Sequence, residues 1–583
     1  MHGPAPLNAT GSDAGARRAP ERRNEPPLAT LISLGVVAAG WAAYLLILQS
    51  HFTFMGDDWE FLLQRRGFSA AVFLNPHNDH IALAPVAIYK ALLALFGMTS
   101  AFPFEVLSTL VYVLSAVLLF VYSYRCAGGW PALLGSVLIL FLGAARTDLL
   151  WSFQIGFSGS IAAGIGALLA LEQGDRRGDL IACGLLVIST SFSELGVPFV
   201  VGALVDVAFG PSPRRRRVYV PLVPLVLYGI WYLGWGHTAQ NALSLHNFVN
   251  SPKFVFDAIS QNLASLLGLA TPLSGSANNL VGLTWGRILL VMALAVAAWR
   301  LWRFGWPSRR LWVVLAAGGT FWFLTALNAN PLLRTPTTGR YQYPGAIFVL
   351  LIAAEFLHGI RPRKRVLIAT TAVCFAAAVS GAIYLHYGYR QMRASSDALR
   401  ARLAAVEIGR GHESSNFPVG ITIFVAYDAR TYLSAADAFG SPAFSESELA
   451  ASAEANRLAA DRVLASAEGI NLLPLVPGSH QIAQEAGRCD TFTGGSQPGS
   501  AAATLGPGDY TLRARKLPAA AGEVRAPVHL ARFADEPLVD LGVVSTRAPK
   551  VLDIPRDRSS RPWRLFWPLG SAVKVCELAR AKR

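Results

Sequence analysis

The residues best suited to chemistry in this sequence begin in one stretch, HFTFMGDDWEFLLQ, at positions 51–64. It carries two adjacent carboxylates, Asp57 and Asp58, followed by Trp59 and Glu60. The preceding residues, 27–50, contain no charged side chain. A carboxylate can act as a general base that takes a proton from a hydroxyl group. Acids at the end of an apolar run can also simply face water, so their neighbours must decide between these interpretations.

A second group of polar residues follows in NPHNDHIALAP, positions 75–85. His77, Asp79 and His80 can bind the hydrogen-bonding groups of a substrate or shape the loop. We do not expect zinc here, because the surrounding carboxylates lack the pattern of a closed zinc site. Lys90, in the next apolar segment, is a candidate for phosphate binding. The alternative for Lys90 is a side chain that reaches from an interfacial helix to water.

Three later positions add further candidates. Asp148, in RTDLLW, is either another catalytic acid or an ion-pair partner of Arg146. Arg340 and Tyr341 stand in GRYQYPGA, where the planar guanidinium of arginine suits bidentate phosphate binding. Arg340 can also be an interface anchor beside its tyrosine neighbours. Glu194 is a weaker candidate, since it is a functional acid only if it lies at membrane depth.

The elements that must position these residues are membrane helices. The chain is 53% hydrophobic and 15% charged, whereas soluble domains are about 25% charged. A helix needs about 20 apolar residues to cross a bilayer. We predict eleven spans, at 28–50, 103–125, 130–145, 152–171, 179–193, 195–209, 217–236, 280–301, 311–328, 342–359 and 366–388. Residues 81–97 are predicted to lie in the membrane interface, and 1–27 to form a disordered tail.

The distribution of arginine predicts the orientation. The formal net charge is +15, but the basic residues form short clusters between apolar runs, which argues against nucleic-acid binding. With the N-terminus in the cytoplasm, clusters such as Arg214 to Arg217 fall inside and the longer outside loops hold few cations. An odd number of spans then places the first loop, 51–102, and the C-terminal region, 389–583, on the extracytoplasmic side.

The C-terminal region has the pattern of an α/β domain. Residues 389–410 continue the last span as a charged helix, 421–427 predict a strand, and 445–469 predict a helix that starts with a capping box. From 490 onwards, short alternating runs separated by turn residues predict a small β-sandwich. Cys489 and Cys576 form a possible disulfide pair if this compartment is oxidising.

In layout and short motifs, residues 28–388 resemble the GT-C glycosyltransferases. These polytopic enzymes use polyprenyl-phosphate sugars and include protein O-mannosyltransferases, the lipid A aminoarabinose transferase and actinobacterial arabinosyltransferases. The resemblance rests on acids just after span one, a long first external loop with a membrane-parallel helix, Asp148 in the second external loop, and GRYQYPGA before a late span. The first loop has no Asp-x-Asp motif, so a requirement for a divalent metal stays open.

The resemblance implies a plasma-membrane enzyme that transfers a sugar from a polyprenyl-phosphate donor to a cell-envelope acceptor. Asp57 or Asp58 would be the general base, with Asp148 as another catalytic acid. The expected substrate-binding residues are Lys90, Arg340, Tyr341, His77, Asp79 and His80. The main alternative is a transporter or lipid flippase, which predicts ionisable residues at mid-membrane and paired broken helices. A purely structural membrane protein would leave the acidic and histidine clusters of the first loop unexplained.

Overall fold

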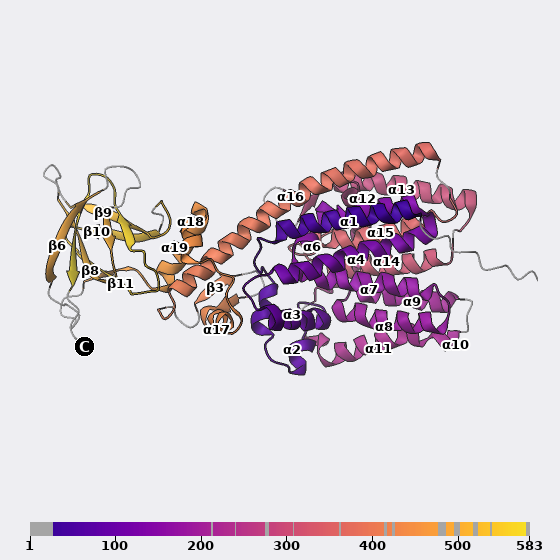
Figure 1. Ribbon diagram of the computed structural model, residues 1–583, viewed down its shortest axis with the longest axis horizontal. Coiled ribbons are helices and arrows are strands. Elements are labelled where there is room, and N and C mark those ends of the chain that lie inside the picture. Colours follow the sequence, from indigo (N-terminus) through magenta and orange to yellow (C-terminus); the bar gives the residue numbers. More distant parts are fainter. Residues whose placement is uncertain are drawn as a thin grey trace, which may run out of the picture.

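A helical bundle and a β-rich C-terminal domain are joined by one long helix, α16 (Figure 1). The computed structural model describes residues 27–210, 214–239, 241–273, 279–306, 308–360, 363–412, 417–421, 426–475, 485–494, 502–516, 523–536 and 539–578. The disordered tail predicted for 1–27 therefore lies outside the described residues, except for Pro27.

Each of the eleven predicted spans overlaps a helix of 12 or more residues. These are α1 (Leu28–Gln49), α4 (Phe102–Ala127), α5 (Gly129–Leu140), α7 (Ile155–Leu171), α8 (Arg176–Phe192), α9 (Gly196–Phe209), α11 (Tyr219–Gly234), α13 (Leu283–Phe304), α14 (Arg310–Leu327), α15 (Gln342–Phe356) and α16 (Lys364–Ile408). Among the described residues, seven helical segments are long and apolar enough to cross a membrane. The chain is thus built as a multi-pass membrane protein, and the number of eleven crossings stays a prediction.

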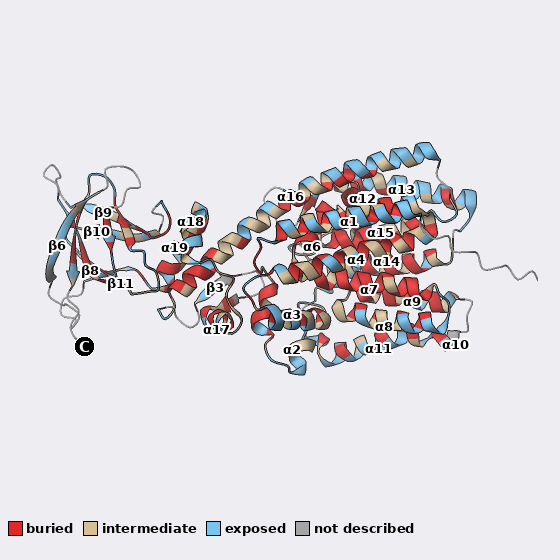
Figure 2. Cartoon of the chain, in the orientation of Figure 1, coloured by how far each residue is buried: buried red, intermediate tan, exposed pale blue. Residues whose placement is uncertain are grey.

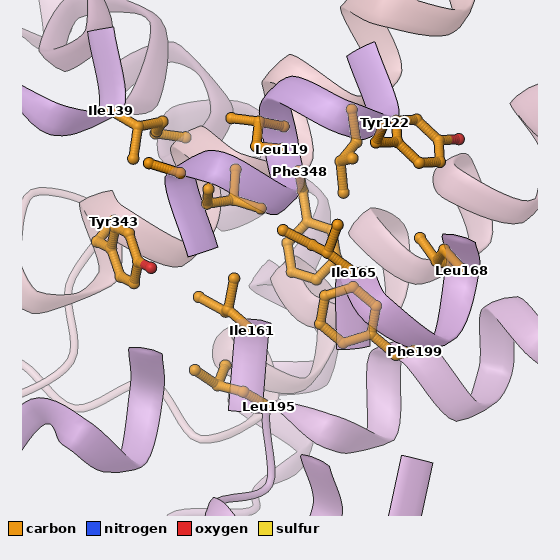
Figure 3. Close-up of a cluster of buried hydrophobic side chains, with 14 of the residues drawn as sticks. Leu119, Tyr122, Ile139, Ile161, Ile165, Leu168, Leu195, Phe199, Tyr343 and Phe348 are labelled. Carbon is orange, nitrogen blue, oxygen red and sulfur yellow. The ribbon is translucent and has the colours of Figure 1, made fainter. Parts of the chain in front are cut away.

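The centre of the bundle is apolar and closely packed (Figures 2 and 3). Phe199 of α9 and Phe348 of α15 lie with ring centroids 5.2 Å apart beside Ile165 of α7. A Cβ atom on Gly143 would lie 1.9 Å from the carbonyl oxygen of Gly381 in α16. Only glycine permits this approach, which is typical of membrane helices. Many side chains of α13 and of the first half of α16 are exposed and apolar, as a lipid-facing surface requires.

One long helix was not predicted from the sequence. Helix α12 (Leu245–Leu266) lies in the loop expected between spans seven and eight and packs against α13, α14 and α15. Its buried face is polar and includes Asp257, Gln261 and Asn262. These side chains interrupt the apolar run that identifies a membrane helix, so α12 has no hydropathy signal.

Short elements cap the bundle at the end that faces the C-terminal domain. After α1 come the π-helical turn η1 (Glu60–Gln64), α2 (Ala70–Leu74) and α3 (Leu83–Phe96), the last of which confirms a helix at 81–97. Its position in the membrane interface stays a prediction. The other short elements are η2 (Gly143–Ala145), α6 (Arg146–Leu150), η3 (Ser152–Gln154), η4 (Gly236–Thr238), β1 (Thr271–Pro272), β2 (Leu280–Val281) and η5 (Gly339–Tyr341). The short helix α10 (Arg214–Arg217) lies at the opposite end of the bundle, next to α9.

The C-terminal region begins with the second half of α16. One correction concerns 421–427, where the structure has two short antiparallel strands, β3 (Pro418–Ile421) and β4 (Ala426–Asp428), instead of one strand. Three helices follow, α17 (Ala429–Phe439), α18 (Glu446–Ala451) and α19 (Glu454–Ala467). The expected capping box is present at α18, formed by Ser445 and Glu448. The predicted helix over 445–469 is divided into α18 and α19 at Ser452 and Ala453.

Two antiparallel sheets pack face to face around one core, which confirms the predicted β-sandwich. The strands are β5 (Leu472–Pro474), β6 (Glu485–Thr493), β7 (Ala503–Leu505), β8 (Gly508–Arg515), β9 (Arg525–Ala531), β10 (Val539–Ser545), β11 (Lys550–Ile554), β12 (Trp563–Phe566) and β13 (Ala572–Leu578). Their spatial orders are β10-β9-β12-β7 and β5-β11-β8-β13-β6. Cys489 and Cys576 lie directly opposite each other in β6 and β13 and form a disulfide.

Candidate functional site

The acidic stretch after α1 forms a compact turn against the wall of the bundle. Gly56 has φ +51°, and a Cβ atom there would lie 3.0 Å from the indole of Trp151. Glycine is therefore required both for the positive φ and for the close approach. The Trp59 indole donates to the carbonyl oxygen of Phe54 at 3.0 Å and closes the turn. The sequence thus fixes the directions in which the two adjacent aspartates point.

Asp58 points into the protein and is fully buried. Its carboxylate accepts hydrogen bonds from the Met55 backbone N–H at 2.8 Å, the Trp151 indole at 2.9 Å and the Tyr89 hydroxyl. Burial raises the pKa of the Asp58 carboxyl to about 6, although these hydrogen bonds act in the opposite direction. With its acceptor capacity used inside the fold, Asp58 is suited to hold the turn in place.

Asp57 points the other way and borders a small cavity of about 40 Å³ together with His77 and Arg340. Its carboxylate lies 3.5 Å from Nε2 of His77, whose Nδ1 lies 2.7 Å from Glu60. Burial alone would lower the pKa of His77, but the hydrogen bonds with Asp57 and Glu60 raise it to about 9. The two carboxylates therefore favour the protonated form of His77, and the contact with its ring keeps Asp57 oriented.

Glu60 completes this cluster. Burial opposes ionisation, but His77 and Arg65 lower the pKa of Glu60 to about 2. Arg65 donates to Glu60 and to the carbonyl oxygens of Asn75 and Pro76. The two predicted clusters of the first loop, around positions 57–60 and 77–80, are thereby joined into one structure.

A larger cavity of about 220 Å³ adjoins the first one. Arg334 binds Asp79 at 2.7 Å and donates from Nε to the Tyr341 hydroxyl at 2.7 Å. Asp79 also lies 3.2 Å from Nδ1 of His80. Burial works against it, but His80 and Arg334 hold the pKa of Asp79 well below its usual range. Burial and the charge of Asp79 raise the pKa of Glu194, which lines the same cavity.

Arg340 lines both cavities and joins them. Its guanidinium lies 5.2 Å from the ring centre of Tyr341 and donates to the carbonyl oxygen of Leu333 at 3.3 Å. Its Nε has no acceptor among the described residues. Asn78, His80 and Phe157 also border both cavities. Together the two hollows place Asp57 at one end, Arg340 in the middle and a polar chamber at the other end.

Three of the predicted site residues do not line these cavities. Asp58 is buried behind Asp57, and Lys90 points to the surface, where it donates to the Gly67 carbonyl oxygen at 2.5 Å and lies over the Phe68 ring. Asp148 is buried beside the turn that carries Arg340, and both its carboxylate oxygens lack a hydrogen-bond donor among the described residues. Of the three predicted catalytic acids, Asp57 alone lines a cavity together with Arg340.

Sequence reasoning missed several residues of the larger cavity. The sequence patterns assign no role to the cavity-lining residues Arg334, Asn78, Asn241, Asn328 and Asn330. Their sequence signal is weak, because asparagine is common in loops. A denser signal is NANPLLRT at 328–335, where amides and a cation precede the arginine motif.

The C-terminal region supports the first loop from behind. Trp59 is fully buried between that loop and the tail, with ring centroids 5.4 Å from Tyr427 and 6.0 Å from Tyr432. The backbone N–H of Thr53 donates to the hydroxyl of Ser396 in α16 at 2.8 Å. The turn that carries Asp57 is therefore held by residues more than 300 positions later in the chain.

Asp79, His80 and Glu194 bring potential metal-ligand atoms within 4.8 Å of one another. Both Asp79 oxygens are engaged, however, one with Arg334 at 2.7 Å and the other with His80 at 3.2 Å. A divalent cation bound there would lie beside the guanidinium of Arg334 and compete with it for Asp79. The group is already neutralised by a protein cation, so we assign no chemical step to a metal.

No protein-family model and no curated protein matches the sequence. Among solved structures, the chain is similar to ArnT from Cupriavidus metallidurans bound to undecaprenyl phosphate. The match has 11% sequence identity and a TM-score of 0.42, and it covers 69% of this chain and 84% of the other. A likeness of this size carries no argument about function, which must come from the site itself.

Proposed function

We propose that the chain is a membrane glycosyltransferase that transfers a sugar from a polyprenyl-phosphate donor to an acceptor hydroxyl outside the cytoplasm. The observation that carries the proposal is the shared cavity of Asp57 and Arg340 at one end of the helical bundle. A carboxylate and a guanidinium that line one hollow are the two groups that this transfer needs. The sequence resemblance to GT-C enzymes points to the same reaction.

In the proposed reaction, Asp57 takes the proton of the acceptor hydroxyl as general base. The new bond forms between the acceptor oxygen and the anomeric carbon, and the bond from that carbon to the phosphate oxygen breaks. The phosphate keeps the electron pair and leaves with the polyprenyl chain. Arg340 stabilises the charge on the departing phosphate, for which its forked guanidinium is well shaped. His77 keeps Asp57 oriented by its 3.5 Å contact.

The larger cavity is suited to the sugar, because amides and carboxylates can bind hydroxyl groups. This cavity is lined by Asn78, Asn328, Asn330 and Glu194. Arg340, the proposed phosphate-binding residue, also lines it. We propose Asp79 and His80 as supports of this chamber through Arg334 and Tyr341. Asp148 and Lys90, which line neither cavity, are assigned no direct role in the transfer.

The test is transfer from a polyprenyl-phosphate sugar, radiolabelled in the sugar, by purified full-length protein in lipid vesicles. Wild-type protein should label an envelope acceptor fraction, and Asp57→Asn should not. Lys90→Gln, a half-buried charge of α3 that lines neither cavity, is the matched control and should behave like wild type. Movement of the labelled donor across the vesicle membrane without transfer of sugar would instead support a flippase.

We also propose that the β-sandwich binds the acceptor. A deletion of 415–583 does not isolate this role, because it also removes Tyr427 and Tyr432, which hold Trp59. A sharper test substitutes exposed residues of β10, such as Val543, with alanine. The KM for the acceptor is then measured separately from donor binding. Unchanged acceptor KM across the exposed face of that sheet would leave the sandwich as a stabilising cap.

A further inference from the structure

Two hollows meet at Arg309, at the end of the bundle farthest from the C-terminal domain (Figure 1). The first is a groove of about 870 Å³ between the end of α9 and the start of α14. Its walls are mainly apolar and include Val205, Phe209, Trp306, Trp312 and Leu315. Phe209 is 66% exposed and Trp306 57% exposed, so the groove opens at the surface where the bundle meets lipid.

The second hollow is a polar cavity of about 190 Å³. The charged side chains that line it are Glu172, Asp206, Arg217, Arg309 and Arg310. Three cations face two carboxylates in this lining, and the exposed Arg215 and Arg216 lie in the adjacent helix α10. Arg217 also pairs with Asp179, and Glu172 also pairs with Arg125, so four arginines face three carboxylates in this network and its net charge is positive.

Arg309 is the residue whose bonding is least complete. It pairs with Asp206 at 2.9 Å, but its contact with the Phe209 carbonyl oxygen is long, at 3.5 Å. Its Nε has no acceptor among the described residues. Arg310 binds Glu172 at 2.6 Å and, like Arg309, keeps more than a third of its side chain exposed. An arginine with spare donors at the mouth of an apolar groove is suited to a phosphate attached to hydrocarbon chains.

We propose that this groove and cavity bind one anionic phospholipid of the bilayer. Its acyl chains lie along α9 and α14 over Trp312, and its phosphate binds Arg309, with the rest of the headgroup in the polar cavity. Basic pockets between membrane helices on the cytoplasmic side commonly bind anionic headgroups, and the positive-inside pattern predicts that this end is cytoplasmic. The site is separate from the Asp57 cavity, which lies at the opposite end of the helices.

The aromatic side chains have a simpler explanation that the test must separate. Trp306 and Trp312 stack at 4.6 Å, and tryptophan is generally enriched at membrane interfaces. An interfacial aromatic belt alone would contact neutral and anionic lipids equally. Selectivity for anionic lipid, and its dependence on Arg309, are therefore the distinguishing properties.

Native mass spectrometry of the full-length protein, released from detergent micelles after addition of phosphatidylglycerol or phosphatidylcholine, tests the proposal. Wild-type protein should retain phosphatidylglycerol in preference to phosphatidylcholine. Arg309→Gln should weaken retention of phosphatidylglycerol about fivefold, the effect of one basic side chain at an anionic headgroup. Arg309→Lys should lose less, because it keeps the charge.

Trp312→Ala is the second variant, because it leaves the ion pair of Arg309 with Asp206 intact and should weaken retention of both lipids. Arg365→Gln and Trp285→Ala, exposed residues outside the two hollows, are the matched controls and should retain lipid like wild type. Thermal unfolding of each variant identifies loss of fold. Equal retention of the two lipids by wild-type protein, or wild-type retention by folded Arg309→Gln and Trp312→Ala, would overturn the proposal.

Discussion

Replacing each of the two adjacent aspartates separately should give two different kinds of defect. Asp57 faces the cavity and has one ion-pair contact, with His77 at 3.5 Å, whereas Asp58 is fully buried and accepts three hydrogen bonds. Asp57→Asn should therefore lower the turnover number by about 10²–10⁴, as expected for the loss of a general base, with little change in stability.

Asp58→Asn should act mainly on stability. The asparagine side chain keeps one acceptor oxygen, but its NH₂ group replaces the second carboxylate oxygen. This NH₂ group would then face a hydrogen-bond donor instead of accepting from it. Loss of a hydrogen bond to a charged group and an unsatisfied buried donor together cost about 2–4 kcal/mol. The elevated pKa of Asp58, about 6, means that burial already disfavours the charged form, so the cost should lie at the lower end near pH 7.

The assay combines thermal unfolding in detergent with single-turnover transfer from the radiolabelled donor. Transfer is measured at 20 °C, a temperature at which the unfolding curves must show that both variants are folded. Asp57→Glu is the informative companion, because it retains the carboxylate and should recover part of the rate. Normal turnover by Asp57→Asn, combined with a folded but inactive Asp58→Asn protein, would reverse the two roles. Wild-type turnover by both variants would refute the glycosyltransferase proposal itself.

Four further predictions follow from the structure. Arg340→Lys keeps the charge but loses the forked guanidinium, so the KM for the polyprenyl donor should rise about tenfold with a smaller change in turnover number, measured by initial rates. Tyr432→Ala removes a fully buried ring beside Trp59 and should cost about 3–5 kcal/mol of unfolding free energy, visible as a lower thermal midpoint; an unchanged midpoint would show that the tail does not support the first loop. Asp57 and Glu60 raise the pKa of His77 to about 9, so the ion pairs of His77 should stabilise the fold fully below pH 6.5 and lose this effect as the pH rises through 9. The difference in unfolding free energy between wild type and His77→Gln, measured from unfolding curves, should therefore be smaller at pH 9.5 than at pH 6. The orientation is tested with one cysteine probe in residues 1–27 and another in residues 540–560. A reagent applied from outside to intact cells should label only the second probe, and equal labelling of both would refute the orientation.

The membrane helices were predictable because their signal is local. An apolar run such as 28–50 identifies a span without knowledge of any neighbour, and the structure has α1 at Leu28–Gln49. Helix α12 escaped prediction because its polar face is buried against other helices. That arrangement depends on partners far apart in the sequence, which composition and periodicity do not reveal.

The candidate site was predictable as a region but not in its detail. The sequence predicts a role for one of Asp57 and Asp58 but not which of them faces a cavity, because their directions depend on a positive φ at Gly56 and on Trp151, 95 positions later. Arg334 illustrates the same limit. Only the folded chain shows that this arginine binds Asp79 of the first loop and so helps to build the larger cavity.

Helix α16 determines how far from the membrane the β-sandwich is held. It is one continuous helix of 45 residues, so it is about 68 Å long, while the hydrocarbon core of a bilayer is about 30 Å thick. More than half of the helix therefore extends beyond the hydrocarbon core as a rigid rod, here called the pillar. An acceptor bound by the sandwich would be held at a fixed distance from the membrane. Each residue added to the outer part of the pillar would raise the sandwich by about 1.5 Å and turn it by about 100°. Insertion or deletion of one residue in α16 would therefore turn the sandwich to a different direction. The same change in a flexible linker would not fix a new direction.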